Sequence, residues 1–324
     1  MVRTLVIGGS KFVGRHLVAE MLRRGHQVSV LNRGKTAQAP PGVEHIQCDR
    51  KDHAALKACL QDREFDAVFD IIAYVPDDVR PLVPMLDGRV GRFVVVSTGS
   101  VYKTVDIYPA KEHCEKVTDN SAGDYGYNKQ LIEQILFEAY EKTGFPVSIV
   151  RPGIIYGPHN PVYRESLFFD RVVKSRPVLI PGDGRYLVQF GYVDDLATLL
   201  LLCAERAEAL GQAFNFAGEY SAPMDDYVEA IFGAAGRRTE VVHYDPERLG
   251  MTAADVSKIF PYRWKAHTMR DISKAIYVLG YKQQVSLWQG LSEAFKWFAG
   301  AGIERKEIDF ALEDRIIEAT EHRD

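Results

Sequence analysis

Residues 8–18 read GGSKFVGRHLV and directly follow the apolar run Leu5-Val6-Ile7. A strand, a glycine-rich turn and a helix in this order typically hold the pyrophosphate of a dinucleotide. Gly8 permits the tight turn, and Gly14 lets the helix pack closely on the strand. Most such loops have a glycine at the position of Lys11. We therefore expect a dinucleotide loop in which the backbone of Lys11, and not its side chain, faces the phosphates.

The second expected strand, residues 27–31, ends at Asn32 and Arg33 without a carboxylate. In NAD-binding folds an acidic residue near this place accepts hydrogen bonds from the ribose 2′-hydroxyl. An arginine suits a 2′-phosphate instead, and Lys11 could reach the same anionic group. The sequence therefore favours NADP, with NAD as the alternative. A second interpretation, in which Arg33 and Lys35 are solvated loop residues, stays open.

The first half of the chain alternates short β-rich runs with helical patterns. The expected strands are residues 4–7, 27–31, 45–47, 67–71, 92–97 and 147–151. This order predicts an α/β fold, a Rossmann-type doubly wound parallel sheet. Such sheets bind ligands beyond the carboxyl ends of their strands.

The pattern changes after Pro152. The stretches RPGIIYGPHNP and VLIPGDGRY read as loops, and helical patterns follow at residues 194–207, 224–235, 272–278 and 287–299. We expect an NAD(P)-binding Rossmann domain over residues 1–155. Residues 156–324 are expected to form mainly a smaller, substrate-binding lobe, with some segments returning to the sheet.

Composition narrows the class of protein. The chain has 324 residues, of which 46% are hydrophobic and 26% charged, with a net charge of −4. These values are ordinary for a globular protein and do not favour a mainly electrostatic nucleic-acid binder. We see no secretory signal, no apolar stretch long enough for a bilayer, and no metal-ligand spacing among the cysteines. The sequence predicts a cytoplasmic protein without a structural metal.

Two further stretches carry candidate chemistry. VVVSTGSVY (94–102) ends a buried strand with hydroxyl residues, and YGYNK (125–129) opens a helical pattern. Tyr125 and Lys129 share one helix face, where the cation stabilises a phenolate. Such a tyrosine can exchange a proton with a substrate oxygen while a nicotinamide exchanges hydride with the attached carbon. Thr98 can hydrogen-bond the same oxygen.

The motifs named so far, together with RPGIIYGP and ISKAIYVLGY, resemble those of an extended short-chain dehydrogenase/reductase of the NAD-dependent epimerase/dehydratase family. Within that family the chain is most similar to the atypical chloroplast stem-loop-binding-protein-like branch and its bacterial relatives. This likeness rests on GGSKFVG, DRKD, VVHYDPERLG and FPYRW. Plant members of the branch are associated with RNA binding and cleavage, and the branch tends to lack the tyrosine that this chain keeps at Tyr125.

The resemblance implies roles for individual residues. Thr98, Tyr125 and Lys129 correspond to the catalytic hydroxyl, the acid/base and its lysine. The residues of the glycine-rich loop and the resemblance together imply these cofactor-binding candidates: Gly8, Ser10, Lys11, Phe12, Val13, Asn32, Arg33, Asp49, Arg50, Ile72, Ala73 and Pro152. The candidates for substrate contact are Tyr74, Ser100, Gln189 and Arg263. For Tyr74, interior packing is an equal alternative.

The chain also departs from the family. Nucleotide-sugar enzymes usually have an arginine that binds a substrate phosphate where this chain has Val188 and Gln189, so that mode of binding is absent or rearranged. Arg185 and Arg263 are the alternative candidates to compensate. The 4,6-dehydratases have an Asp-Glu pair where this chain has Gly99 and Ser100. Elimination is therefore disfavoured, which leaves oxidation, reduction, or epimerisation through a transient ketone.

The sequence thus predicts an NAD(P)-dependent oxidoreductase or epimerase. Its small-molecule substrate would be a sugar-like molecule, nucleotide-linked sugars included, that reacts at a hydroxyl or carbonyl, with Tyr125 as the acid/base. The alternative is an RNA-binding or RNA-processing protein on a dinucleotide-binding scaffold. A third alternative is a redox sensor that holds NADP without turnover. We expect no membrane association, and homodimerisation is common in the family.

Overall fold

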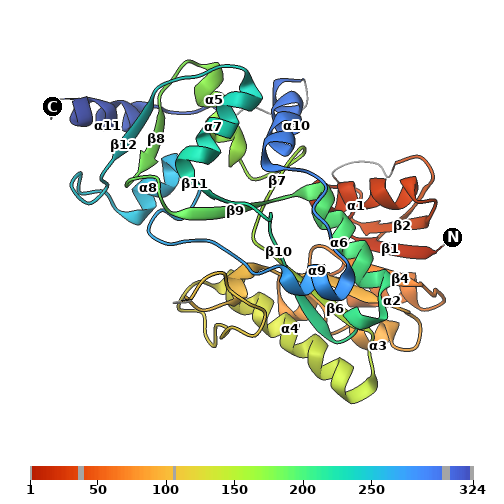
Figure 1. Cartoon of the computed structure of the whole chain (residues 1–324). Helices are drawn as coiled ribbons and strands as arrows, with labels where there is room; N and C mark the ends of the chain where they lie inside the picture. Colours follow the sequence, from red (N-terminus) through yellow and green to blue (C-terminus); the bar gives the residue numbers. More distant parts are fainter. Residues whose placement is uncertain (1, 36–39, 105–106, 301–306, 322–324) are drawn as a thin grey trace. The chain divides into compact units, whose positions relative to one another are not determined.

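The structure, a computed structural model, describes residues 2–35, 40–104, 107–300 and 307–321. The chain forms two compact units, each built from three segments (Figure 1). The first unit comprises Met1–Ile155, Val193–Ala217 and Arg270–Gln284. The second unit comprises Tyr156–Tyr192, Gly218–Met269 and Val285–Asp324.

The first unit is organised around a seven-stranded sheet in which all pairings are parallel. The strand order is β10-β6-β5-β4-β1-β2-β3. The strands are β1 (Arg3–Ile7), β2 (Gln27–Asn32), β3 (Val43–Gln47), β4 (Ala67–Asp70), β5 (Phe93–Val96), β6 (Val147–Pro152) and β10 (Gln212–Phe216). The expected Rossmann-type fold is confirmed.

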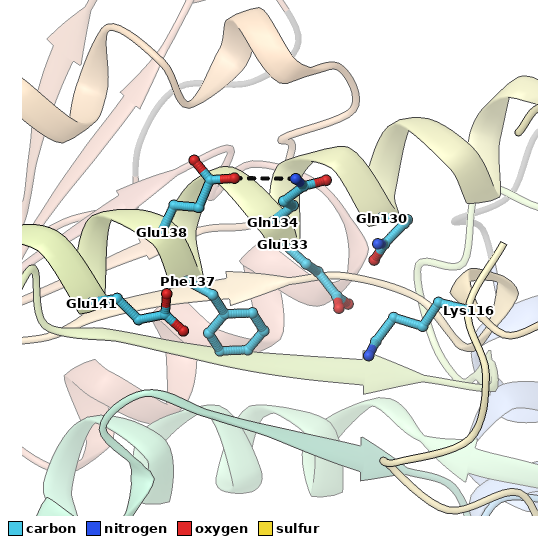
Figure 2. Close-up of a pocket in the computed structure, with 7 residues that line it drawn as sticks. All are labelled: Lys116, Gln130, Glu133, Gln134, Phe137, Glu138 and Glu141. Atoms are coloured by element: carbon cyan, nitrogen blue, oxygen red, sulfur yellow. Dashed lines mark hydrogen bonds between the residues drawn. The ribbon is translucent and has the colours of Figure 1, made fainter. Parts of the chain in front are cut away.

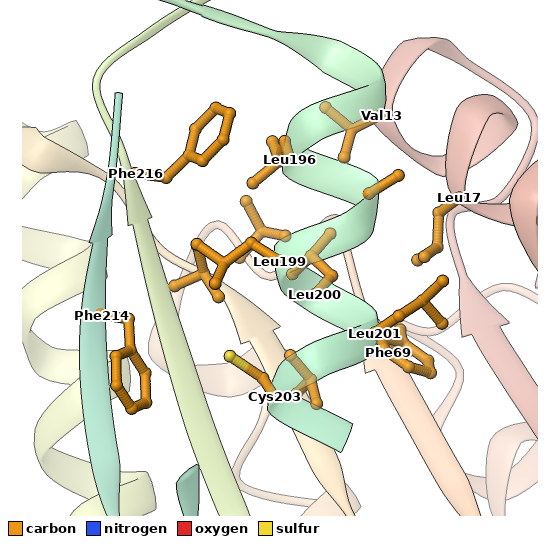
Figure 3. Packing of buried hydrophobic residues seen from close by; sticks show 14 of the residues in the cluster. Val13, Leu17, Phe69, Leu196, Leu199, Leu200, Leu201, Cys203, Phe214 and Phe216 are labelled. Atoms are coloured by element: carbon orange, nitrogen blue, oxygen red, sulfur yellow. The ribbon is translucent and has the colours of Figure 1, made fainter. Parts of the chain in front are cut away.

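Alternate residues of each strand face two separate hydrophobic clusters, because successive side chains of a strand point to opposite faces. On one face Val6 and Phe69 pack with α1 (Phe12–Arg23), α6 (Val193–Glu205) and α9 (Ser273–Leu279). Figure 3 shows Phe69 in the same cluster as Leu17 of α1 and Leu200 of α6. On the other face Leu5 and Val68 pack with α2 (His53–Leu60), α3 (Leu82–Leu86) and α4 (Asp124–Thr143). Burial on both faces explains why β4 and β5 read as apolar runs, whereas the edge strand β3 is mostly exposed and does not.

The strand order reverses at β1, because β2 and β3 lie to one side of it and β4, β5 and β6 to the other. Ligands of such sheets bind beyond the carboxyl ends of the strands at this reversal. The segments found there are the loop after β1, the loop after β4 with the 3₁₀ turn Pro76–Asp78, and the 3₁₀ turn Gly99–Val101 after β5. The candidate site is therefore built from these three segments and α4.

Two further sheets are small: a three-stranded sheet of order β11-β9-β7, with β7 at Ile154–Tyr156, and the pair β12-β8. β9 (Leu187–Tyr192) pairs antiparallel with β11 (Ser221–Pro223), and β8 (Val178–Pro181) pairs parallel with β12 (Val241–Tyr244). The helices of the second unit are α5 (Glu165–Val173), α7 (Met224–Ala235), α8 (Ala253–Ile259), α10 (Leu287–Ala299) and α11 (Ala311–Glu321). A stacked pair, Phe190 and Tyr227, whose ring centroids are 4.1 Å apart, lies in its aromatic core.

Two stretches expected to be loops contain strands. Residues Ile154–Tyr156, within RPGIIYGPHNP, form β7, and Val178–Pro181, within VLIPGDGRY, forms β8. The prediction was wrong because Pro and Gly flank these short apolar runs and masked their strand character. A further 3₁₀ turn spans Ala207–Ala209.

Among the residues that the structure describes, no helix combines the length and the apolar character needed to cross a membrane. Within the same described ranges, no group of three or more His, Cys, Asp or Glu side chains is arranged to hold a metal ion.

Candidate functional site

The loop after β1 has the close packing that its glycines predict. Gly8 has φ of +99°, and a Cβ there would approach Ile72 Cγ2 to 2.6 Å. A Cβ on Gly14 would lie only 2.3 Å from the Gly8 carbonyl oxygen. A side chain at either position would therefore push the loop apart, which explains the choice of glycine.

Lys11 is the residue that precedes α1, with an extended backbone and no capping hydrogen bond from its side chain. Its side chain is exposed, as expected for a residue whose backbone alone faces a ligand. Phe12, the first residue of α1, has φ of +31°, a strained value for a non-glycine residue. Because the Lys11 side chain does not cap the helix, the first backbone N–H groups of α1 are not occupied by it. Uncapped N–H groups and the positive end of the helix dipole together favour the binding of an anion.

At the end of β2, the side chain of Asn32 is already engaged. Its Oδ1 accepts a hydrogen bond from the Gly34 backbone N–H (2.7 Å) and lies 3.0 Å from His45 Nε2. Arg33 is exposed. Among residues 32–34, the Arg33 guanidinium is therefore the charged group that is exposed to solvent at this strand end.

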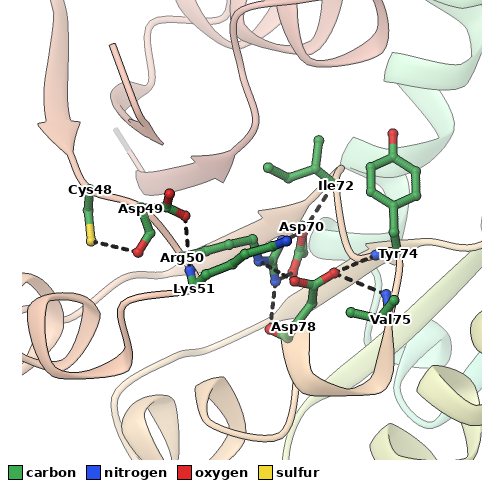
Figure 4. Close-up of polar contacts among 9 residues, drawn as sticks. All are labelled: Cys48, Asp49, Arg50, Lys51, Asp70, Ile72, Tyr74, Val75 and Asp78. Atoms are coloured by element: carbon green, nitrogen blue, oxygen red, sulfur yellow. Dashed lines mark hydrogen bonds and ion pairs between the residues drawn. The ribbon is translucent and has the colours of Figure 1, made fainter. Parts of the chain in front are cut away.

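Arg50, one of the expected cofactor-binding residues, has a buried guanidinium bound to two aspartates (Figure 4). Its terminal nitrogens donate to both carboxylate oxygens of Asp70 at 2.8 and 2.7 Å, and its Nε lies 3.2 Å from Asp78 Oδ1. Asp70 also accepts from the Ile72 N–H, and Asp78 Oδ2 from the N–H groups of Tyr74 and Val75. Arg50 thus holds the loop after β4, and its contact with the cofactor stays a prediction.

The turn after β5 carries Thr98. Thr98 is buried, and its Oγ1 accepts a hydrogen bond from the Ser100 N–H at 3.1 Å. Ser100 itself is exposed. Arg270, which the sequence analysis did not single out, donates to the Gly99 carbonyl oxygen at 3.0 Å, and its guanidinium lies 5.4 Å from the Tyr102 ring centroid. Arg270 therefore restrains the turn on which Thr98 and Ser100 stand.

Lys129 projects from α4 into the interior of the first unit, with only 2% of the residue exposed. Its Nζ donates to the carbonyl oxygen of Val96, the last residue of β5, at 2.8 Å. Burial lowers the pKa of Lys129 to about 8, and the Asp70 carboxylate is the strongest influence in the opposite direction. The lysine is thus fixed to the strand that leads into Thr98.

Two tyrosine rings lie beside the Lys129 ammonium. Its Nζ is 5.9 Å from the ring centroid of Tyr125 and 5.0 Å from that of Tyr74. Both tyrosines remain half exposed, at 50% and 53%. Burial raises the pKa of Tyr74, and Tyr125 contributes in the same direction. The structure therefore brings Tyr125 and Lys129 together, as their spacing predicts, and adds Tyr74.

A second buried charge lies one helical turn beyond Lys129. Glu133 accepts from Ser97 Oγ at 2.6 Å and from Arg151 Nε and a terminal nitrogen at 2.9 and 2.6 Å. Arg151 also donates to Tyr102 Oη at 3.0 Å. Sequence reasoning missed Glu133 and Arg151. The spacing of four residues between Lys129 and Glu133 was a signal that these two share one helix face, but no spacing pointed to Arg151.

A hollow of about 230 Å³ lies along α4 (Figure 2). It is lined by Lys116, Gln130, Glu133, Gln134, Phe137, Glu138 and Glu141. None of the predicted cofactor or catalytic residues lines it, although Glu133, one helical turn from Lys129, does.

The remaining candidates differ in exposure and in the unit to which they belong. Val13, Ala73 and Pro152 are buried, whereas Ser10 is half-buried and Asp49 exposed. Gln189, buried on β9, and Arg263, exposed, belong to the second unit. The assignment of all these residues to cofactor or substrate stays a prediction.

The fold and this arrangement define a class: a Rossmann-type α/β protein with a glycine loop after β1, a threonine just after β5, and a tyrosine and a lysine near the start of α4. The profile of the NAD dependent epimerase/dehydratase family matches residues 4–217. The chain belongs to this family, so both the expected resemblance and the expected class, an NAD(P)-dependent enzyme of short-chain dehydrogenase/reductase type, are confirmed.

Individual relatives agree with this assignment. The chain is 32% identical to the chloroplast stem-loop binding protein of 41 kDa b of Arabidopsis thaliana, over 97% of this chain and 84% of that protein. It is 26% identical to the UDP-glucose 4-epimerase of Mycolicibacterium smegmatis, over 91% of this chain and 98% of that protein.

Solved structures share the fold. The UDP-glucose 4-epimerase of Thermotoga maritima, solved with UDP-glucose, superposes with a TM-score of 0.76 at 21% identity, covering 91% of this chain and 98% of the other. The UDP-glucuronic acid 4-epimerase of Bacillus cereus, solved in complex with NAD, gives 0.72 at 21% identity and the same coverages.

The loop fits the dinucleotide that the family implies. Its glycines leave no room for Cβ atoms between Gly8, Ile72 and Gly14, and the start of α1 has no side-chain cap. A backbone shaped in this way can approach a pyrophosphate closely.

Proposed function

We propose that the protein is an NAD(P)-dependent oxidoreductase or epimerase that acts on a hydroxyl or carbonyl of a sugar-like substrate, nucleotide-linked sugars included. The observation that carries the proposal is the position of Lys129. Its buried ammonium lies beside the Tyr125 ring and is anchored at the end of β5, two residues before Thr98. Burial of a charge is costly, and one hydrogen bond to a carbonyl oxygen offsets only part of that cost, so a buried ammonium at this place favours a role in the chemistry.

In this proposal Tyr125 exchanges a proton with the substrate oxygen through its phenol oxygen. The Lys129 ammonium stabilises the phenolate that remains when the proton has left. Thr98 donates a hydrogen bond to the same substrate oxygen and so holds it beside Tyr125. The bound nicotinamide supplies or accepts the hydride.

The cofactor would be held by the first unit. The N–H groups at the start of α1, next to Ser10 and Lys11, would bind the pyrophosphate, and Ile72 would lie under the cofactor. Arg33 would favour the 2′-phosphate of NADP, since β2 ends without a carboxylate and the Asn32 oxygen is already engaged. Several structures of similar fold contain NAD, so NAD stays the alternative.

The cofactor preference is tested with purified protein freed of bound ligand. Fluorescence titration with NADPH and NADH would give the two dissociation constants for the wild type and for Arg33→Ala. We expect NADPH binding to weaken about tenfold in the variant, because one charged contact contributes about 1.5 kcal/mol, while NADH binding changes less. Equal weakening of both would remove the basis for NADP preference.

The catalytic assignment is tested by turnover. A panel of free and nucleotide-linked sugars is incubated with each cofactor, and products are followed by nicotinamide absorbance and by NMR for epimers. For any substrate found, Tyr125→Phe should lower kcat by a factor of about 100 or more without weakening cofactor binding. A Tyr125→Phe variant with wild-type kcat would exclude Tyr125 as the acid/base.

A second candidate function is recognition of stem-loop nucleic acid. It is favoured by the relative that is 32% identical over 97% of this chain, whose name describes stem-loop binding. Binding of a stem-loop RNA with a steep dependence on salt would support it. Failure to bind at low salt would exclude it.

A further inference from the structure

The proposed function gives Lys129 one tyrosine partner, whereas the structure gives it two. The Lys129 Nζ is nearer to the ring centroid of Tyr74, at 5.0 Å, than to that of Tyr125, at 5.9 Å. Both distances lie within the range of about 6 Å in which an aromatic face attracts a cation. Tyr74 follows β4, so the second ring reaches the ammonium from a different part of the sheet.

The backbone of Tyr74 is held firmly. Its N–H donates to Asp78 Oδ2 at 2.7 Å, and Asp78 is bound to the buried Arg50 (Figure 4). Arg50 in turn is held by two hydrogen bonds to Asp70, the last residue of β4. This chain of buried charges fixes the backbone of the loop from which the Tyr74 ring extends.

Several groups influence the charge of Lys129. Burial is the largest influence and lowers its pKa to about 8. The charged groups that act on it are Asp70, Asp78 and Glu133, which raise its pKa, and Arg50, which lowers it. Tyr74 and Tyr125 are the titratable neighbours whose rings face it. Asp70 and Asp78 are bound to Arg50, and Glu133 is bound to Arg151. Because these carboxylates are partly neutralised by the arginines, the two rings also contribute to the stabilisation of the Lys129 ammonium.

We propose that Tyr74 is a positioning residue of the Tyr125–Lys129 pair: its ring face holds the Lys129 ammonium and thereby extends to higher pH the range over which that charge is present beside Tyr125. The contact between ring and ammonium does not depend on the proposed function. Only its consequence for catalysis rests on Tyr125 being the acid/base.

Two variants separate the ring from the hydroxyl. Tyr74→Phe keeps the aromatic face, so the pKa of Lys129 should move by less than about 0.2 units. Tyr74→Leu keeps an apolar cover over the lysine but removes the aromatic face. Because the ring favours the charged form, its loss should lower the pKa of Lys129 by about 0.5 to 1 unit.

The measurement is an NMR titration of protein labelled with ¹³C at the lysine ε-carbons, without cofactor or substrate. The Lys129 signal is identified by its absence in Lys129→Met, and melting temperatures show that each variant is folded. A lower pKa in Tyr74→Leu together with an unchanged pKa in Tyr74→Phe supports the proposal. An unchanged pKa in Tyr74→Leu, a raised one, or equal decreases in both variants would overturn it. If Tyr74→Leu does not fold, Tyr74→Met takes its place with the same expectations.

This titration needs no turnover, so its outcome is independent of the test with Tyr125→Phe. Once a substrate is known, kcat of Tyr74→Leu should begin to fall at a lower pH than kcat of the wild type and of Tyr74→Phe. A loss of kcat in Tyr74→Leu that is equal at every pH would indicate a merely structural ring.

Discussion

Replacement of Lys129 by methionine should stabilise the protein at neutral pH. Burial lowers the lysine pKa from 10.5 to about 8, so the ammonium in the folded state costs about 3 kcal/mol relative to the unfolded chain at pH 7. Methionine keeps an unbranched stem of similar length and removes that cost. The variant also loses the hydrogen bond to Val96, which contributes about 1 kcal/mol. We therefore expect Lys129→Met to unfold with a free energy about 2 kcal/mol higher.

The extra unfolding free energy of Lys129→Met should decrease as the pH rises. Between about pH 8 and 10.5 the folded lysine binds fewer protons than the unfolded one, so the stability of the wild type rises with pH relative to the variant. By about pH 9.5 the advantage of Lys129→Met should have disappeared. Urea denaturation followed by far-ultraviolet circular dichroism at pH 7 and at about pH 9.5 measures both free energies.

Lys142→Met is the matched control, because Lys142 lies on the same helix with its side chain exposed. Its free energy of unfolding should change by less than about 0.5 kcal/mol at both pH values. A Lys129→Met variant that is less stable than the wild type at pH 7 would refute the reasoning, as would a gain that does not change with pH.

Two further predictions concern buried ion pairs. Glu133→Gln leaves the Arg151 guanidinium buried without its anion and should cost about 3 to 5 kcal/mol of unfolding free energy by urea denaturation. A loss below about 1 kcal/mol would show that water reaches Arg151. In the second unit, Glu313→Gln breaks the buried pair with Arg171 that joins α11 to α5, and hydrogen exchange of α11 should rise strongly. Unchanged exchange would show that the apolar contacts of α11 suffice.

The sheet of the first unit could be predicted because its strands are short apolar runs between helical patterns. FVVV in β5 and LVI in β1 are buried on both faces and read as such. β10 was not among the strands assigned from the sequence, since it pairs with β6 after some sixty intervening residues and QAFNF carries no marked pattern. Pairing at that distance is decided by packing and not by local sequence.

The candidate site was predictable to a similar degree. The spacing of Tyr125 and Lys129 places them on one face of any helix, and the structure has that helix. The burial of Lys129 and its contact with Tyr74 depend on how α4 meets the loop after β4, which no spacing reveals. For the same reason the role of Arg50 in holding that loop was not foreseen, because its partners Asp70 and Asp78 come from another strand and turn.

The measurement that tests the central claim most directly is calorimetric titration of ligand-free protein with NADP⁺, NADPH, NAD⁺ and NADH. The loop around Gly8 and Gly14 and the Thr98–Tyr125–Lys129 set predict that at least one of these dinucleotides binds, with one molecule per chain. Folded protein that binds none of the four, with no heat and no change in melting temperature, would contradict the account.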